Sequence, residues 1–463
     1  MELRIDRQAL VPLVQQIVDA LAGWLRQSEV LPGTRLPSAR QIARDNLLSQ
    51  SSVVEACERL VAEGVLASRQ GSGFFVADPV LAARRQRDYP WFEGAAVKHD
   101  GVFGELKLGC GGLPISWRET DDLGYAIREI SRTDMAGLFN YGTPLGLPAL
   151  RQHIRKRLLQ LHIAVQEHQI LTTAGASQGL DLIVRTLLKP GECVVVESPG
   201  YSMLFELLRL RGVHMIEVPR TPNGPDINVL EALLLQYRPR ALFINSFYHN
   251  PTGSSLTPKV ARQILQLAKT HCTLVVEDDV YADLSGGPGT RLAALDTAEN
   301  VIYVGSFSKT LSSSLRVGFV VAGAGVVSRL AEVKMVSSMG ASQFCESVVA
   351  CLLASGAYRK LVQRQRQRLN SDRETALQVL EDAEWEVFGK PAGGLFIWAR
   401  SPMADYDQVR AQAQRFGVQL SSATAFSPTG EPGDWQRINV AYASDPRARA
   451  FFQATTVDRP QAF

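Results

Sequence analysis

From about residue 103 onward, short apolar stretches alternate with segments of helical periodicity. Each apolar stretch has the length of one buried strand, and strand–helix alternation predicts a mostly parallel sheet with helices on both faces. An α/β fold is therefore expected, with ligands bound at the carboxyl ends of the strands. The expected strands are 170–173, 193–197, 213–218, 241–246, 273–277, 301–305 and 317–322.

After about residue 345 the pattern becomes helical, and two short strands follow near 394–399 and 437–442. This change predicts a smaller C-terminal α+β subdomain. We therefore expect one domain over 103–463, with a large subdomain at about 120–345 and a small one at about 346–463.

The first eighty residues have a different organisation. A helix is expected over 11–27, a short one after Ser38, and a third that starts at residues 49–52 and ends at Gly64. Two short strands follow, at 65–68 and 74–76, around a turn at 69–73. Three helices and a two-stranded wing predict a winged helix-turn-helix over 1–78.

A linker is expected over 79–102. It carries Tyr89, Trp91 and Phe92 close together. Burial of three neighbouring aromatic side chains is favourable, so we expect them to dock on the large domain.

Composition limits the possible settings. The six cysteines are scattered without a C-x-x-C pair, which indicates neither a metal site nor a disulfide framework and fits a reduced, cytoplasmic setting. The longest apolar stretch, 317–327, is shorter than the roughly 20 residues of a membrane span. Residues 1–80 contain eight arginines, no lysine and nine acids, and this slightly acidic balance counts mildly against DNA binding.

Lys309 follows one of the expected strands and lies between small polar residues. Ser306 and Ser308 precede it, and Arg316 follows seven residues on. A buried lysine amine is nucleophilic, and hydroxyl and guanidinium groups can hold a phosphate. The pattern predicts a Schiff-base site for a phosphorylated aldehyde cofactor. The simpler interpretation, an exposed loop lysine, does not account for this frame.

Other strand ends carry polar or aromatic residues that suit the same cofactor. The amides of Ala176 and Ser177 open a helix and can face an anion. Tyr201 can stack on a flat ring, although a loop tyrosine is also consistent with simple packing. Asn250 and Tyr281 can hydrogen-bond a ring oxygen, and Asp278 can pair with a pyridinium nitrogen. Each motif is also consistent with an ordinary turn; their order along the chain is what favours a site.

These motifs carry a resemblance to known families. Residues 103–463 resemble a fold type I pyridoxal-phosphate enzyme of the class I aminotransferase kind. Residues 8–78 resemble the GntR-type winged helix, through the segments LPSARQIA at 36–43 and EGVL at 63–66. The fusion of the two is similar to the MocR/GabR subfamily of bacterial transcription regulators, which are expected to be homodimers.

The resemblance implies roles for individual residues. Lys309 would be the catalytic lysine that holds pyridoxal 5'-phosphate as an internal aldimine. Arg437 would bind the carboxylate of an amino acid, although a surface ion-pair arginine is the simpler alternative. Tyr141 would reach the phosphate across a dimer interface. The implied cofactor-binding residues are Tyr141, Ala176, Ser177, Tyr201, Asn250, Asp278, Tyr281, Ser306, Ser308, Lys309 and Arg316.

The DNA-binding segment departs from its family at one place. Relatives usually begin the recognition helix with Ser-Arg-x-Thr-Val, whereas this chain has Gln50 at the arginine position. Gln50 can still bind adenine edges, but it neutralises no phosphate. The expected DNA-binding residues are Arg35, Ser38, Arg40, Gln50, Ser51, Ser52, Arg69 and Gly71.

Three functions compete at this stage. The first is a transcription regulator that binds double-stranded operator DNA and responds when an amino acid or amine forms an external aldimine with the cofactor; in a variant, the cofactor itself is the signal. The second is an aminotransferase with an accessory DNA-binding domain. The third is a DNA-binding protein whose large domain has lost the cofactor, which the intact motifs around Lys309 argue against.

Overall fold

The computed structural model describes most of the chain. The described residues are 13–27, 33–62, 65–69, 73–76, 106–118, 121–133, 139–285, 289–296, 300–403, 405–422, 424–431 and 433–456, with Leu3, Ile5 and Gly287. The expected linker, with its three aromatic residues, lies outside them. The chain divides into two compact units, residues 1–97 and 98–463. The expected boundaries at 78 and 102 stay predictions.

The first unit contains the three helices and the hairpin that the sequence predicts. The helices are α1 (Leu13–Gln27), α2 (Ala39–Asp45) and α3 (Gln50–Ala62), and the strands β1 (Leu66–Arg69) and β2 (Gly73–Val76) pair antiparallel. Ser38 caps α2, since its side chain accepts a hydrogen bond from the amide of Gln41. The apolar faces of the helices meet in one core, around Ile17, Leu21 and Leu60.

The second unit is built on a mixed eight-stranded sheet with the order β3-β10-β9-β8-β7-β4-β5-β6. All seven expected strands are present, so the predicted α/β fold is confirmed. Six strands run in the same direction, whereas β10 pairs antiparallel with both neighbours and β6 pairs antiparallel with β5. The strands are β3 (Ile170–Thr173), β4 (Cys193–Ser198), β5 (His214–Thr221), β6 (Gly224–Pro225), β7 (Ala241–Ile244), β8 (Leu274–Asp278), β9 (Val301–Ser306) and β10 (Gly318–Val321).

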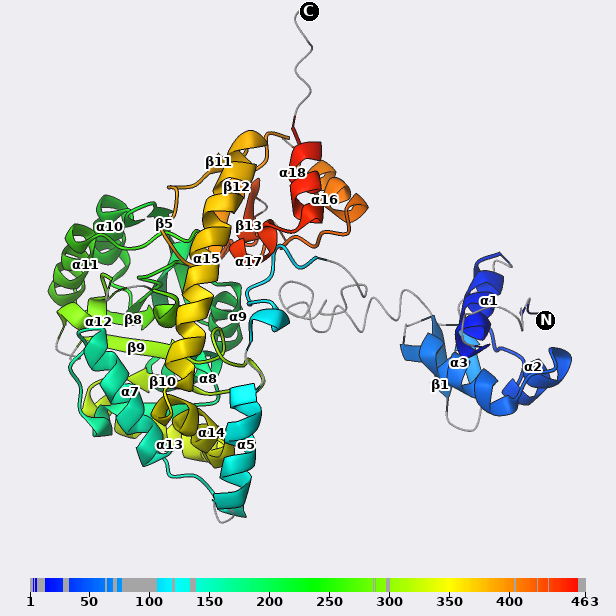
Figure 1. Ribbon diagram of the computed structural model, residues 1–463, viewed down its shortest axis with the longest axis horizontal. Coiled ribbons are helices and arrows are strands. Elements are labelled where there is room, and N and C mark those ends of the chain that lie inside the picture. The colour runs from blue at the N-terminus through cyan, green and yellow to red at the C-terminus, as the bar shows by residue number, and fades with distance from the viewer. Residues whose placement is uncertain are drawn as a thin grey trace, which may run out of the picture. The chain divides into compact units, whose positions relative to one another are not determined.

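Helices cover both faces of this sheet (Figure 1). Successive residues of β4 show why: Val194 and Val196 pack into one core, and Val195 packs into the other. One face is covered by α8 (Ala176–Leu187), α9 (Ser202–Arg211) and α13 (Ala324–Ser338). The other is covered by α5 (Asp121–Thr133), α7 (Pro148–Gln160), α10 (Ile227–Tyr237), α11 (Pro258–Thr270), α12 (Leu292–Leu295) and α14 (Gln343–Ala354).

A smaller α+β part follows, as the sequence predicts. Its three-stranded sheet has the order β11-β12-β13, with β11 (Glu386–Val387), β12 (Phe396–Arg400) and β13 (Trp435–Asn439). The helices α16 (Tyr406–Arg415), α17 (Val440–Ala443) and α18 (Pro446–Ala454) complete it. The expected strand at 437–442 is therefore wrong in its second half. Asn439 ends the strand because its side chain accepts a hydrogen bond from the amide of Ala441 and caps α17.

The long helix α15 (Ala357–Asp382) joins the two parts of this unit (Figure 1). Leu361 and Val362 belong to the core of the large sheet, whereas Leu369 and later residues belong to the core of the small one. The packing therefore changes from one core to the other within α15. Helix α14 still packs against α5 and α7 of the large part. The expected division near residue 345 stays a prediction.

Among the described residues, no helix has the length and apolar character that crossing a bilayer requires. In the same part of the chain, no group of three or more His, Cys, Asp or Glu side chains is arranged to hold a metal ion.

Candidate functional site

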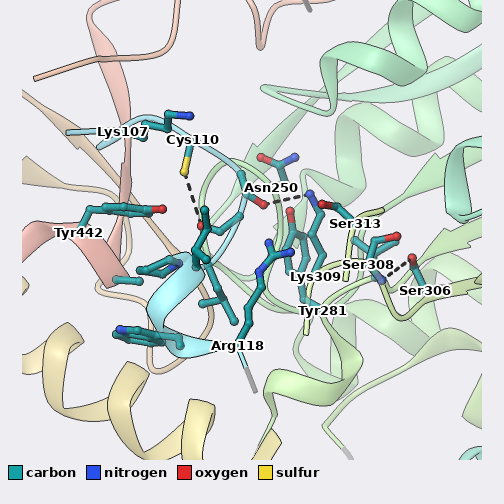
Figure 2. A pocket seen from close by; sticks show the side chains of 18 of the residues that line it. Lys107, Cys110, Arg118, Asn250, Tyr281, Ser306, Ser308, Lys309, Ser313 and Tyr442 are labelled. Carbon is teal, nitrogen blue, oxygen red and sulfur yellow. Dashed lines mark hydrogen bonds between the residues drawn. The ribbon is translucent and has the colours of Figure 1, made fainter. Parts of the chain in front are cut away.

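A cavity of about 1010 Å³ opens at the carboxyl ends of the large sheet's strands. Most of the residues expected to bind the cofactor line it, although they come from segments far apart in the sequence. In Figure 2, Asn250, Tyr281 and Lys309 lie close together, with Ser306 and Ser308 beyond them. The expected residues that line the cavity are Ala176, Ser177, Tyr201, Asn250, Asp278, Tyr281, Ser306, Ser308, Lys309 and Arg316.

Lys309 presents its amine to this cavity. Its Nζ donates a hydrogen bond of 2.9 Å to the carbonyl oxygen of Gly111 and lies 6.0 Å from the ring centroid of Tyr281. Burial and the nearby Arg437 guanidinium lower the pKa of Lys309 from 10.5 to about 8, against the opposing effect of Asp278. A substantial fraction of the amine is therefore neutral and nucleophilic at mildly alkaline pH.

Asp278 ends β8 with its carboxyl at the cavity wall. Burial and the adjacent Asp279 raise the pKa of Asp278 from 3.8 to about 7. Asp279 itself forms a fully buried ion pair with Arg291 and accepts a hydrogen bond of 2.9 Å from the Tyr303 hydroxyl. Asp278 has no such guanidinium partner among the described residues, so a cation beside it would favour its ionised form.

An anion cradle forms where α8 begins. Gly175 precedes the helix with φ of +81°, which aims the first amides of α8 toward the cavity. Arg316 lies directly beside it, donating to the carbonyl of Ala174 at 3.1 Å, and a Cβ on Gly175 would come within 2.4 Å of the guanidinium. The Ser308 amide donates to the Ser306 hydroxyl at 3.1 Å. Hydroxyls, helix amides and a guanidinium together can bind a phosphate.

Two tyrosines form part of the wall. Tyr281 is 2% exposed and packs edge-on against Phe396, with ring centroids 5.5 Å apart. Burial raises the pKa of Tyr281 and of Tyr201, so both hydroxyls stay protonated and can donate hydrogen bonds. Tyr201 follows β4 and immediately precedes α9, within the cavity lining.

The segment 106–113, called the strap below, covers the cavity from the side of the small subdomain. Leu106, Leu108 and Leu113 pack into that subdomain's core. The buried Asn439 fixes the strap further, because its side-chain amide donates to the carbonyls of Cys110 and Gly112 at 2.9 and 2.8 Å. The strap therefore meets Lys309 on one side while it is hydrogen-bonded to β13 on the other.

Arg437 lies behind the strap rather than in the cavity lining of the described residues. Its Nε and Nη2 donate to the carbonyl of Gly109 at 3.2 and 2.7 Å, and its Nη1 donates to Oδ1 of Asn250 at 2.9 Å. The guanidinium also contacts the rings of Phe396 and Phe426.

A Cβ on Gly111 would lie 3.6 Å from Lys309 Nζ and 3.8 Å from both Nη atoms of Arg437. Gly111 therefore lies beside both the amine and the guanidinium.

Tyr141 does not line the cavity of its own chain in the described structure; it is 79% exposed. Among the expected DNA-binding residues, Arg35, Arg40, Gln50 and Ser51 are exposed on the first unit. Ser38 and Ser52 are engaged locally: Ser38 caps α2, and the Ser52 amide donates to the Ser49 hydroxyl at 3.1 Å. The structure describes the backbone of Arg69 but not its side chain, and Gly71 lies outside the described residues.

Sequence reasoning missed several cavity residues, most of them contributed by the strap, by the segment just after it and by the small subdomain. The signal available was the pair Gly111-Gly112 before Pro114, which indicates a backbone that passes close to something else. Figure 2 shows Cys110 and Tyr442 at the end of the cavity opposite Ser306. The missed lining residues include Lys107, Cys110, Gly111, Trp117, Arg118, Asn245, Ser313, Tyr442, Asp445 and Arg447.

Comparison with family models assigns both units. Residues 106–454 match the model described as aminotransferase class I and II, and residues 13–76 match bacterial regulatory proteins of the gntR family. The first match covers most of the chain and includes the whole cavity described above.

Individual relatives agree with this division. The uncharacterized HTH-type transcriptional regulator YdfD of Bacillus subtilis is 29% identical over 458 residues, covering 94% of this chain and 93% of that protein. The 2-aminoadipate transaminase of Thermus thermophilus is 34% identical over 248 residues, covering 52% of this chain and 62% of that protein.

A solved structure shows the same fold in the larger unit. LysN, the α-aminoadipate aminotransferase of Thermus thermophilus, was crystallised in complex with N-(5'-phosphopyridoxyl)-L-leucine and superposes with a TM-score of 0.70 at 26% identity, covering 78% of this chain and 92% of LysN. The chain therefore belongs to the aminotransferase class I and II family, and it carries a gntR-family domain on the N-terminal side of that fold.

Proposed function

We propose that this chain is a DNA-binding transcription regulator whose larger unit binds an amino acid or amine beside Lys309, and that this binding alters its affinity for operator DNA. The gntR-family match and the full-length similarity to an HTH-type transcriptional regulator support the first half. An operator in a bacterial cell would place the protein in the cytoplasm. The response to a small molecule rests on the cavity.

Pyridoxal 5'-phosphate is the cofactor of this family, and the residues of the cavity fit it. Lys309 would carry the cofactor covalently, Asp278 would face its ring nitrogen, and the anion cradle of Ala176, Ser177 and Arg316 would hold its phosphate. When bound, the cofactor supplies an aldehyde that exchanges between primary amines and a ring that withdraws electrons. A cationic ring nitrogen would also stabilise the ionised carboxyl of Asp278, whose pKa burial raises.

The observation that carries the proposal is the strap's double contact. The strap offers the Gly111 carbonyl to the amine of Lys309 and the Gly109 carbonyl to the guanidinium of Arg437. A ligand with an amine and a carboxylate needs those same two groups. Its carboxylate would compete with Gly109 for Arg437, because a charged acceptor forms the stronger hydrogen bond with a guanidinium.

Displacing these carbonyls would move the strap, which continues along the chain toward the linker and the DNA-binding unit. The strap is held to the small subdomain by its buried leucines, by the Asn439 side chain and by a hydrogen bond of 2.8 Å from the Leu106 amide to the carbonyl of Gly417. Ligand and DNA would then favour different positions of one segment, which is the requirement for coupling between two sites.

A homodimer is part of this proposal. Tyr141 is 79% exposed and Phe139 is 80% exposed, although both are large aromatic residues. Their exposure supports burial against a second copy, with Tyr141 reaching that copy's anion cradle. The two DNA-binding units of such a dimer would then match an operator with two-fold symmetry.

The alternative is an aminotransferase with an accessory DNA-binding domain. Lys309, with its pKa of about 8, is suited to proton transfer as well as to covalent attachment. Similarity to the 2-aminoadipate transaminase of Thermus thermophilus favours this alternative for the larger unit alone. It does not account for the gntR-family domain, which transamination does not require.

A gel-shift experiment distinguishes the two. Full-length protein loaded with the cofactor would be titrated against DNA from its own upstream region, with and without a panel of amino acids and amines. We expect one class of ligand to change the apparent DNA affinity without sustained turnover of a 2-oxo acid. Lys309→Ala should still bind DNA, but it should lose both the ligand response and the absorbance near ~410–430 nm expected of a lysine-bound cofactor.

Steady transamination by a protein that shifts no specific DNA fragment in the gel would instead establish the aminotransferase function. A wild-type protein that shows no cofactor absorbance after addition of pyridoxal 5'-phosphate would contradict both functions. A ligand response that persists in Lys309→Ala would contradict the assigned role of this lysine.

A further inference from the structure

Arg118 lines the cavity at the point where the strap ends. It follows the short helix η2 (Ile115–Trp117) and forms that helix's C-cap. Figure 2 shows its side chain extending toward Lys309 and Tyr281. A Cβ on Gly112 would lie 3.8 Å from Arg118 Nη2, so the guanidinium passes directly beside the strap.

No carboxylate among the described residues pairs with the guanidinium of Arg118. Its Nε is buried, and within the described ranges it has no hydrogen-bond partner and no ion pair with a carboxylate. Arg118 as a whole is half-buried, but a buried donor such as its Nε is unfavourable without an acceptor. A hydrogen bond from this nitrogen to a ligand acceptor would therefore contribute more binding free energy than a hydrogen bond formed on the exposed protein surface.

The other arginines around the cavity already have partners or assigned tasks. Arg316 belongs to the anion cradle, Arg437 is bound by Gly109 and Asn250, and Arg447 pairs with Asp445 at 3.1 Å. Of the two carboxylates in the lining, Asp445 is engaged by that pair, and Asp278 faces the expected ring nitrogen. Arg118 is left as a cation for which neither the cofactor nor the α-carboxylate of a ligand supplies an anion.

Arg437 and Arg118 flank consecutive residues of the strap. Arg437 is next to Gly111, and Arg118 is next to Gly112. The two guanidinium groups therefore lie beside neighbouring residues of the strap, and a ligand that displaces the Gly109 carbonyl from Arg437 would have Arg118 close by for a second acidic group. An amino acid with a neutral side chain would fill the cavity but leave Arg118 without an acceptor.

We propose that the ligand of this cavity is an α-amino acid with a second anionic group, which Arg118 binds while Arg437 binds the α-carboxylate. This inference rests on the proposed function and narrows its ligand to acidic amino acids. A guanidinium binds a carboxylate through two parallel hydrogen bonds, so the preference should be geometric as well as electrostatic. Amides of the same shape should bind more weakly.

The test uses cofactor-loaded, full-length protein and two matched ligand pairs, L-glutamate with L-glutamine and L-aspartate with L-asparagine. Affinity would be measured by calorimetry and by the shift in cofactor absorbance. In the wild type, the better of the two acids should bind at least about tenfold more tightly than its amide, as expected for a charge-assisted bidentate contact. Arg118→Gln should bring that ratio close to one.

Two further variants keep the result interpretable. Arg447→Gln removes a cation that also lines the cavity but is paired with Asp445. This variant should keep the wild-type ratio of affinity for the acid to affinity for its amide. Arg118→Lys should retain part of the preference, because an ammonium preserves the charge but not the bidentate geometry. If Arg118→Gln fails to fold, this graded response of Arg118→Lys decides the matter.

A normal cofactor band together with equal affinities for acid and amide in the wild type would overturn this inference alone. An unchanged ratio in Arg118→Gln would do the same. Absence of the cofactor band from the wild-type protein would remove the proposed function, and this inference with it.

Discussion

At the scale of single residues, burial of the Asp278 carboxyl carries a cost in stability. Its pKa is about 7 in the folded protein, whereas its ordinary value is 3.8. Between these values the folded protein binds more protons than the unfolded chain, so stability falls as pH rises through this range. Burial of an ionisable group at the cavity wall is tolerated where a cationic partner is expected.

Asp278→Asn should therefore stabilise the cofactor-free protein. We expect a gain of ~2 kcal/mol in the free energy of unfolding at pH 8, and a smaller gain at pH 5, where the wild-type carboxyl is protonated. With cofactor bound, the wild type should instead be more stable than Asp278→Asn, because an amide cannot form an ion pair with the ring nitrogen. Urea denaturation at both pH values, with and without cofactor, measures this. An equal gain at pH 5 and pH 8 would contradict the assigned titration.

Gly175 allows a second residue-scale prediction. Gly175→Ala would place a Cβ within 2.4 Å of the Arg316 guanidinium at a φ of +81°. We expect cofactor affinity to fall by at least about tenfold, since Arg316 must move out of the anion cradle. The measurement is a titration of cofactor absorbance or fluorescence.

Gly191→Ala is the matched control. Gly191 has a φ of +85°, but no atom would lie within 4 Å of a Cβ added there, so backbone strain is the only cost. The control should lower stability by ~1 kcal/mol and leave cofactor affinity unchanged. Equal effects of the two substitutions on affinity would show that strain, rather than the crowding of Arg316, is responsible.

At the scale of elements, sequence patterns predicted the strands of the large sheet because both of their faces are buried. In β4, Val194, Val195 and Val196 are all fully buried, and such runs are visible without a structure. Residues at strand ends, such as Asp278 and Lys309, could be predicted for the same reason. Parallel strands bring their carboxyl ends to one edge wherever the intervening chain goes.

The strap could not be predicted in this way. Its contacts run from the Gly109 and Gly111 carbonyls to Arg437 and Lys309, over separations of about 200 to 330 residues. Backbone carbonyls carry no signature in the sequence, and loop residues such as Arg118 have no periodicity to place them. The end of β13 was missed because Asn439 stops the strand through a local side-chain hydrogen bond, which competes with an apolar pattern that continues past it.

The first residue of α3 is the clearest place to test the DNA-binding unit. Gln50 is exposed where relatives usually carry an arginine. Gln50→Arg should raise affinity for operator DNA, and it should steepen the dependence of log affinity on log salt by about one. Fluorescence anisotropy across a salt series measures both quantities.

Glu58→Gln is the control for net charge, since it changes the charge by the same amount on an exposed face of the same helix, two turns further on. It should leave the salt slope nearly unchanged, because only a direct phosphate contact releases counterions. Matching slopes for the two variants would indicate a long-range charge effect instead of a contact at Gln50.

At the scale of the whole molecule, each of the two units has its own hydrophobic core. Ile17, Leu21 and Leu60 centre the core of the first unit. The larger unit has one core on each side of its large sheet and another in its small subdomain. Scanning calorimetry should therefore show two transitions. Cofactor should raise the transition temperature of the larger unit alone. At a free cofactor concentration one hundred times its dissociation constant, the free energy of unfolding of that unit should increase by about 2.7 kcal/mol.

Lys309→Ala provides the comparison for this experiment. Its larger unit should show a much smaller cofactor shift, while the transition of the smaller unit stays where it is. A single transition that moves as a whole on cofactor addition would contradict the independence of the two cores.

The strap also gives the protein a mechanical property. Residues 106–113 are a wall of the cavity and, at the same time, the N-terminal end of the segment that matches the aminotransferase family. Tension applied to the chain before residue 106 would do work on the hydrogen bonds that close the site over Lys309 and Arg437. In the homodimer proposed above, the spacing of the DNA half-sites would act on these hydrogen bonds, and so on how tightly the cavity holds its ligand.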